Sequence, residues 1–180
     1  MSKSIFSACL WVFYALLTPN AANAEMIVQA CFSPNGKCAA HVLREIGSAK
    51  KELLVAVYAF TSDDLANALV QAKKRGVAVQ IVIDREFDLG NPSSKGKFFD
   101  AQKIPLRRIY GAKPVGAEKD GGLMHQKFAI IDRSVVLAGS YNWTYAAENS
   151  NDENLLLFRE AAPLAEEYRR AFVRLWERKP

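Results

Sequence analysis

The chain has 180 residues, of which 50% are hydrophobic and 24% are charged, as is ordinary for a globular protein. A domain of this size buries roughly 68–70% of its unfolded surface. This excludes a small scaffold that depends on a metal or a disulfide to fold. The net charge of +5 permits a polyanionic partner without requiring one.

The first 24 residues have the three regions of a secretory signal peptide. Lys3 gives a positive start, residues 5–17 are apolar except for Ser7, and small residues at Ala22 and Ala24 follow. An apolar run of 13 residues is too short to span about 30 Å of hydrocarbon as a helix, which disfavours a membrane anchor. We therefore predict cleavage after Ala24, a periplasmic or secreted protein without stable membrane association, and one mature domain over residues 25–180.

Two cysteines of the mature chain, Cys31 and Cys38, bracket a turn signal at residues 34–36. An exported protein can keep a disulfide, and a loop this short would be stabilised by roughly 2.5 kcal/mol in the chain-entropy model. The alternative is a pair of buried thiols, and the sequence leaves both open. Two cysteines without nearby histidines are too few for a structural zinc site.

From residue 26 onward, strand and helix periodicities alternate, and Ser62 with its neighbours caps the second helix, which ends before Gly76. Strands joined by such helices predict parallel βαβ units with helices on the faces of the sheet. The predicted strands cover residues 26–32, 52–60 and 77–83, and the predicted helices cover 38–49 and 61–75.

The second half begins with an irregular stretch from 85 to 122, which contains turns, a short helix or turn near 98–102, a short strand near 104–110 and a loop. A hairpin over residues 123–140 follows, with its turn at Arg133 and Ser134. A strand (153–158) and a final amphipathic helix (163–178) complete the chain, and no internal repeat is present.

The hairpin carries a set of residues suited to phosphate chemistry, with the spacing H-x-K-x4-D-x6-G-S-x-N from His125 to Asn142. Strand periodicity puts His125 and Lys127 on one face, where a nucleophile and a cation can contact one phosphate. A neutral imidazole can attack phosphorus and form a covalent intermediate. Asp132 faces the other way by the same periodicity, so we interpret it as structural, and Gly139 lets a ligand or backbone approach closely.

This pattern resembles the signature of the phospholipase D superfamily. The chain length, the single motif and the N-terminal segment resemble most its short bacterial members, the Nuc-type endonucleases. The resemblance implies a mixed β-sheet between two helical layers. It also implies a covalent phosphohistidine on His125, phosphoryl-oxygen contacts from Lys127, Ser140 and Asn142, and no metal or other cofactor. Glu153 matches the family's glutamate that contacts the nucleophile.

A departing oxygen needs a proton, which calls for a second imidazole. The only other histidine, His41, lies in a predicted helix without a lysine two residues on or a G-S-x-N partner. A two-fold dimer would supply a second His125 at one site. Family members with two motifs do this within one chain, so the single motif implies a homodimer.

DNA or RNA is the predicted substrate, because a basic stretch leads into the motif and can contact phosphate backbones. An acyl chain would want an apolar lip, and the loop before the motif offers only Pro114 and Val115. A secreted phospholipase D and a non-catalytic nucleic-acid-binding module are the alternatives. Substrate contacts are predicted for Lys95, Lys97, Arg107, Arg108, Lys113 and Lys119.

Overall fold

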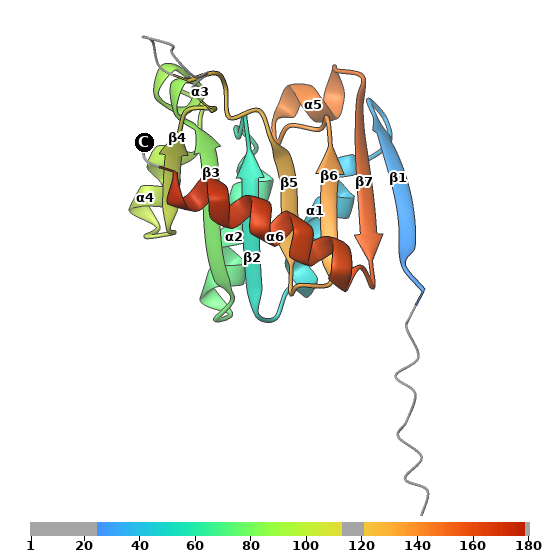
Figure 1. The fold of residues 1–180 in the computed structure, drawn as a ribbon. Helices are drawn as coiled ribbons and strands as arrows, with labels where there is room; N and C mark the ends of the chain where they lie inside the picture. Colours follow the sequence, from blue (N-terminus) through green and yellow to red (C-terminus); the bar gives the residue numbers. More distant parts are fainter. Residues whose placement is uncertain (1–24, 113–120, 179–180) are drawn as a thin grey trace, which may run out of the picture.

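The computed structural model describes residues 25–112 and 121–178. The predicted signal peptide, Lys113 and Lys119 lie outside these ranges. Within them, the chain folds around one seven-stranded sheet with the order β1-β7-β6-β5-β2-β3-β4 (Figure 1). β2, β3 and β4 are parallel, and the remaining neighbours pair antiparallel. The strands are β1 Ile27–Ser33, β2 Glu52–Val57, β3 Ala78–Asp84, β4 Leu106–Ile109, β5 Lys127–Ile131, β6 Val135–Gly139 and β7 Glu153–Arg159.

Helices cover both faces of this sheet. α1 and α2 lie behind it in Figure 1, and α6 crosses the front. The continuous apolar run of β2 explains this arrangement, since Leu53 and Val55 pack into the α1–α2 cluster and Leu54 into the α6 cluster. The predicted mixed sheet between helical layers is confirmed. The helices are α1 Cys38–Ser48, α2 Asp63–Lys74, α3 Arg85–Gly90, α4 Gly96–Ala101, α5 Tyr145–Asn149 and α6 Ala162–Glu177.

Two features differ from the prediction. The parallel βαβ expectation holds for β2-α2-β3 but is wrong for the first unit. β1 runs in the same direction as β2, yet three strands separate them and β1 pairs only with β7. In addition, α3 forms in the stretch predicted to be irregular, and α5 forms where no element was predicted. They have 6 and 5 residues, too few for a helical period to show in sequence, and each begins at a capping side chain, Asp84 and Thr144.

The two cysteines form a disulfide that closes the turn between β1 and α1, with a Cα–Cα distance of 5.7 Å. This settles the alternative that the sequence left open. Cys31 belongs to β1, and Cys38 is the first residue of α1. The bridge therefore ties the edge strand of the sheet to the first helix.

Asp132 anchors the turn of the β5–β6 hairpin. Its carboxylate accepts hydrogen bonds from the backbone N–H groups of Lys50, Lys51 and Glu52, at 2.8, 2.7 and 3.0 Å. Partial burial alone would raise the pKa of this carboxyl, but the three N–H donors together with the charge of Lys51 lower it below its ordinary value. The side chain joins the hairpin turn to the start of β2, as its predicted structural role requires.

Asp132→Asn should lower the free energy of unfolding by about 1–2 kcal/mol at pH 7, because a charged acceptor is lost. Asparagine suits the test, since Asp132 has a φ of 50° and asparagine tolerates this conformation. The folded-state pKa of Asp132 lies below its unfolded value of about 3.9. The contribution of the Asp132 carboxylate to the free energy of unfolding is therefore present above pH 4, and it is lost as the pH falls through the folded-state pKa.

Urea unfolding at pH 7 and at pH 3 or below measures this difference, with the exposed Asp152→Asn variant as the control. The gap between Asp132→Asn and the wild type should shrink in acid. A gap of the same size at both pH values would contradict the proposed electrostatic anchor.

Candidate active site

The register of the sheet gathers the motif at one edge. Lys127, at the start of β5, pairs with Val57 at the end of β2. The other antiparallel pairs bring the end of β6 and the start of β7 to the same edge. This is the upper edge in Figure 1, at the carboxyl ends of β2 and β3. His125, Lys127, Ser140, Asn142 and Glu153 all belong to this edge.

His125 is exposed and lies two residues before β5. The residues on both sides of it are fixed by backbone contacts. The fully buried carboxylate of Asp84 accepts from the N–H of Met124 at 2.8 Å. The carbonyl of Gln126 accepts from the N–H of Tyr58 at 2.8 Å, which extends the ladder beyond the end of β2. The backbone of the predicted nucleophile is therefore held in place while its ring reaches solvent.

The ring of Tyr58 packs against both His125 and Lys127. Its ring centroid lies 4.7 Å from that of His125 and 5.1 Å from Nζ of Lys127. The ring of Phe87 packs against Tyr58 at 5.3 Å. Sequence reasoning missed this residue, because it placed Tyr58 inside a buried strand. The available signal was an aromatic side chain with a polar tip near the carboxyl end of a parallel strand.

Lys127 is partly buried and directed along the same edge. Its Nζ donates to the backbone carbonyl of His125 at 2.9 Å. Burial lowers the pKa of Lys127, and the nearby carboxylate of Glu153 opposes that shift. A desolvated cation interacts more strongly with a phosphoryl oxygen than a fully hydrated one does.

Ser140 and Asn142 each accept a hydrogen bond from a backbone N–H group of a neighbouring segment. Ser140 Oγ accepts from the backbone N–H of Asn154 at 3.0 Å, and Asn142 Oδ1 accepts from the N–H of Ala59 at 3.3 Å. These bonds orient the two side chains and leave the Ser140 hydroxyl hydrogen and the Asn142 amide hydrogens as donors. Donors of this kind are suited to the oxygens of a phosphodiester.

The backbone of β7 lies so close to Gly139 that it leaves no room for a side chain there. A Cβ atom at this position would lie 2.2 Å from the carbonyl oxygen of Asn154. Of the two reasons that the sequence suggested for this glycine, close approach of a backbone is the one observed. The same close approach allows Asn154 to bind Ser140.

Glu153 is the first residue of β7 and lies opposite Ser33 of β1. Its carboxylate accepts from Asn151 Nδ2 at 3.2 Å. Across residues 25–112 and 121–178, no hydrogen bond joins it to the imidazole of His125. Its electrostatic effect reaches both Lys127 and Tyr141, so it lies among the motif residues.

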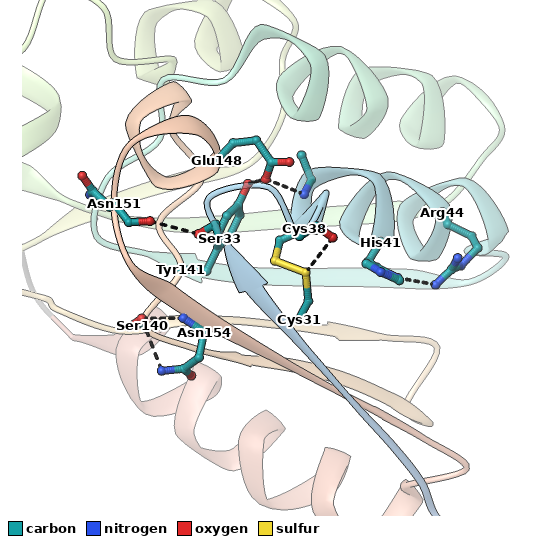
Figure 2. Close-up of a disulfide and its surroundings, with 12 residues drawn as sticks. Cys31, Ser33, Cys38, His41, Arg44, Ser140, Tyr141, Glu148, Asn151 and Asn154 are labelled. Carbon is teal, nitrogen blue, oxygen red and sulfur yellow. Dashed lines mark hydrogen bonds between the residues drawn. A yellow bond between two sulfur atoms is a disulfide. The ribbon is translucent and has the colours of Figure 1, made fainter.

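The second histidine has a different environment. His41 lies on α1, and its Nδ1 accepts from Arg44 Nη2 at 2.7 Å (Figure 2). None of its described contacts involves a motif residue. Among the described residues, no group of three or more His, Cys, Asp or Glu side chains could hold a metal ion.

The basic residues divide into two groups. Lys95 pairs with Asp63 at 2.6 Å, and Arg108 pairs with Asp88 and Asp100, each at 2.6 Å. Sequence reasoning could not see these pairings, because Asp63 and Asp88 lie far from their partners along the chain. Lys97 and Arg107 remain exposed, with Arg107 stacked 5.5 Å from the ring of Trp176. No helix in the described part of the chain is long and apolar enough to cross a membrane.

Comparison with known proteins gives matches over most of the chain. The family model described as cardiolipin synthase, phospholipase D-like domain, matches residues 42–176. A phospholipase D of Rickettsia felis is 33% identical over 141 residues, which are 78% of this chain and 65% of the relative. A mitochondrial cardiolipin hydrolase of Xenopus laevis is 35% identical over 136 residues, 76% of this chain and 60% of the relative. The chain thus spans less than two thirds of these curated relatives.

Among solved structures, the chain is similar to Nuc from Salmonella typhimurium, described as a phospholipase D family member. The TM-score is 0.75 and the sequence identity is 36%, and the match covers 84% of this chain and 95% of the other. The similarity therefore includes nearly the whole of the Salmonella chain.

Replacing Glu153 with Gln should lower the pKa of Lys127 further, because the carboxylate opposes the effect of burial on this pKa. NMR titration of the lysine side-chain resonances, with Lys127 assigned through Lys127→Arg, measures this pKa. Asp152→Asn, which neutralises the exposed neighbouring carboxylate, should leave it unchanged. An unchanged Lys127 pKa in Glu153→Gln would show that Glu153 does not act on the lysine.

Proposed function

This chain belongs to the phospholipase D superfamily of phosphodiesterases, and on that basis we propose that it is an endonuclease acting through a covalent phosphohistidine. The observation that carries the proposal is the exposed ring of His125 beside the partly buried ammonium of Lys127, both against Tyr58. The donors of Ser140 and Asn142 belong to the same edge of the sheet. Together these groups provide a nucleophile and a set of positive or donor groups for one phosphodiester.

The proposed reaction has two steps. A neutral imidazole nitrogen of His125 attacks phosphorus, the P–N bond forms and the P–O bond to the leaving nucleoside breaks. Lys127, Ser140 and Asn142 stabilise the charge on the phosphoryl oxygens during this step. A protonated imidazole gives its proton to the departing oxygen. In the second step it removes a proton from water, which displaces His125 and restores the enzyme.

We further propose that the active site is shared across a homodimer. Each chain offers one suitable imidazole, since the Nδ1 of His41 is occupied by Arg44. The reaction needs a nucleophile and an acid, so a second copy of His125 must supply the other role. The exposure of His125 at the sheet edge is compatible with two copies meeting about a two-fold axis.

Nucleic acid is the favoured substrate because the chain resembles the Nuc-type endonucleases in its motif and is similar to Nuc over 95% of the Salmonella chain, and because Lys97 and Arg107 are exposed cations. One observation favours phospholipid as the second candidate. Leu89 and Leu123 are 60% and 50% exposed, and Leu123 lies two residues before His125. The sequence did not predict these two exposed apolar side chains, and two relatives carry names of lipid enzymes. The intact set of motif residues disfavours a non-catalytic binding module.

An oxidising compartment is the proposed location, namely the periplasm or the exterior of the cell. The Cys31–Cys38 disulfide and the signal-like residues 1–24 support it. Mature protein recovered from that compartment should begin at Glu25, which its N-terminal sequence checks.

We expect the purified mature protein to cleave plasmid DNA in the presence of EDTA, because His125 replaces a metal-activated nucleophile. His125→Ala should lose at least about 10³-fold in rate, since the attacking group is removed, and His41→Ala should retain activity. Phosphatidylcholine and cardiolipin vesicles serve as the second substrate arm. Loss of DNA cleavage in EDTA with recovery in magnesium would refute the mechanism, and faster hydrolysis of the vesicles would favour the lipid candidate.

The shared site predicts how mixed dimers behave. A dimer of one wild-type and one His125→Ala chain should lose most multiple-turnover activity, because every site lacks one imidazole. In the wild type one imidazole must be neutral and the other protonated, so the rate should follow a bell-shaped pH profile. Sedimentation measures the oligomeric state at assay concentration. Full activity from a monomer would contradict the shared site.

A further inference from the structure

We propose that Glu148 is a positioning residue that joins the Cys31–Cys38 disulfide to the Ser140–Asn142 segment, so that full activity needs the oxidised bridge. The inference rests on the proposed phosphodiesterase chemistry, and it concerns residues outside the motif. Figure 2 shows the group, with the disulfide between β1 and α1, and with Glu148 and Tyr141 beside it.

Glu148 connects two segments that are far apart in the chain. Its Oε2 accepts from the hydroxyl of Tyr141 at 2.7 Å and from the backbone N–H of Ala39 at 2.9 Å. Tyr141 is 2% exposed and lies between Ser140 and Asn142, the two predicted oxygen-binding residues. Ala39 directly follows Cys38. One carboxylate oxygen therefore links the disulfide-closed turn to the motif.

The start of α1 depends on this outside acceptor. The residue before the helix, Lys37, provides no side-chain hydrogen bond to the first turn. Glu148 satisfies the N–H of Ala39 instead, and a carboxylate there also interacts favourably with the helix dipole. Burial, together with Glu148, raises the pKa of Tyr141, so its hydroxyl keeps the proton that it donates.

The other end of the disulfide leads to the motif by a second route. Cys31 belongs to β1, in which Phe32 lies opposite Asn154 and Ser33 lies opposite Glu153. Ser33 Oγ also donates to the carbonyl of Asn151 at 3.3 Å. Asn154 in turn binds Ser140 through its backbone and side-chain nitrogens (Figure 2).

These routes matter because β1 is an edge strand. Among the described residues it pairs with β7 alone, so the disulfide is the covalent restraint on its end nearest the site. A dithiol reductant transfers two electrons and two protons to the bridge, which leaves two thiols, and the reductant becomes a disulfide. The turn then loses its cross-link, and Ala39 is no longer fixed beside Glu148. Tyr141 and the donors on either side of it should lose their alignment.

The redox state of the compartment should therefore control the activity of the enzyme. In a reducing cytoplasm the thiols stay unpaired, and the enzyme should be weakly active while its own cell's nucleic acid is within reach. Exchange with a disulfide-bonded oxidant after export forms the bridge and aligns the site.

The test measures hydrolysis of bis(p-nitrophenyl) phosphate and of plasmid DNA by the oxidised protein and by the dithiothreitol-reduced protein. Both are assayed in the mature form, at a temperature far below the melting temperature. Reduction should lower kcat roughly tenfold with KM within about twofold, because alignment in the transition state is lost. The double variant Cys31→Ser with Cys38→Ser should have the lowered kcat without any reductant, and adding the reductant should not change it. The chromogenic diester reports the chemistry whatever the natural substrate is, so failure of the nuclease proposal is seen separately on the plasmid.

Tyr141→Phe and Glu148→Ala test the link itself. Each should lower kcat at nearly constant KM, and the double variant should be no slower than the slower single variant, because both remove one interaction. Asn149→Ala, on the same short helix, is the matched control and should retain kcat. A lower melting temperature with unchanged kcat, in these variants or on reduction, would assign the group a purely structural role and overturn the inference.

Discussion

The antiparallel pairing of β5 with β2 on one side and β6 on the other is the constraint on which the rest of the site depends. This register sets Lys127 opposite Val57, and it directs Phe128 into the α6 cluster. A slip of one residue would exchange the faces, turning Lys127 toward the α6 cluster and Phe128 toward the α1–α2 cluster. The apolar faces of the sheet therefore hold the motif residues in register, and the core fixes the geometry of the candidate site.

Carboxylates that accept backbone N–H groups hold loops at both edges of the sheet, with Asp84 and Glu148 at the motif edge and Asp132 at the opposite edge. Asp84 binds Met124 next to His125, Asp132 binds the start of β2, and Glu148 binds the start of α1. Each joins segments that are at least 40 residues apart in the chain. A charged acceptor that satisfies an otherwise unpaired N–H is a strong local restraint. The side chain of His125 can thus remain at the surface while the backbone beside it is fixed.

The hydrogen bonds that the site residues make within the protein determine which of their polar groups remain for a ligand. Ser140 and Asn142 bind the protein through their acceptor oxygens, so the remaining capacity is donor capacity. Burial of Lys127 lowers its pKa, and Glu153 opposes that shift. A surface made of donors and one restrained cation suits a phosphodiester better than a neutral ester, because charge accumulates on non-bridging oxygens. Lys95 and Arg108 are already paired with carboxylates.

The sequence by itself determined the hairpin, its alternation of faces and the motif, since all of these depend on local periodicity and fixed spacing. The tertiary structure decided what depends on pairing between distant segments. It placed β1 at the far edge beside β7, brought Tyr58 beneath His125, and gave Lys95 and Arg108 their carboxylate partners. Strand order and ion pairing leave no periodic trace in a single chain, because they are fixed by which surfaces bury one another after the local elements have formed.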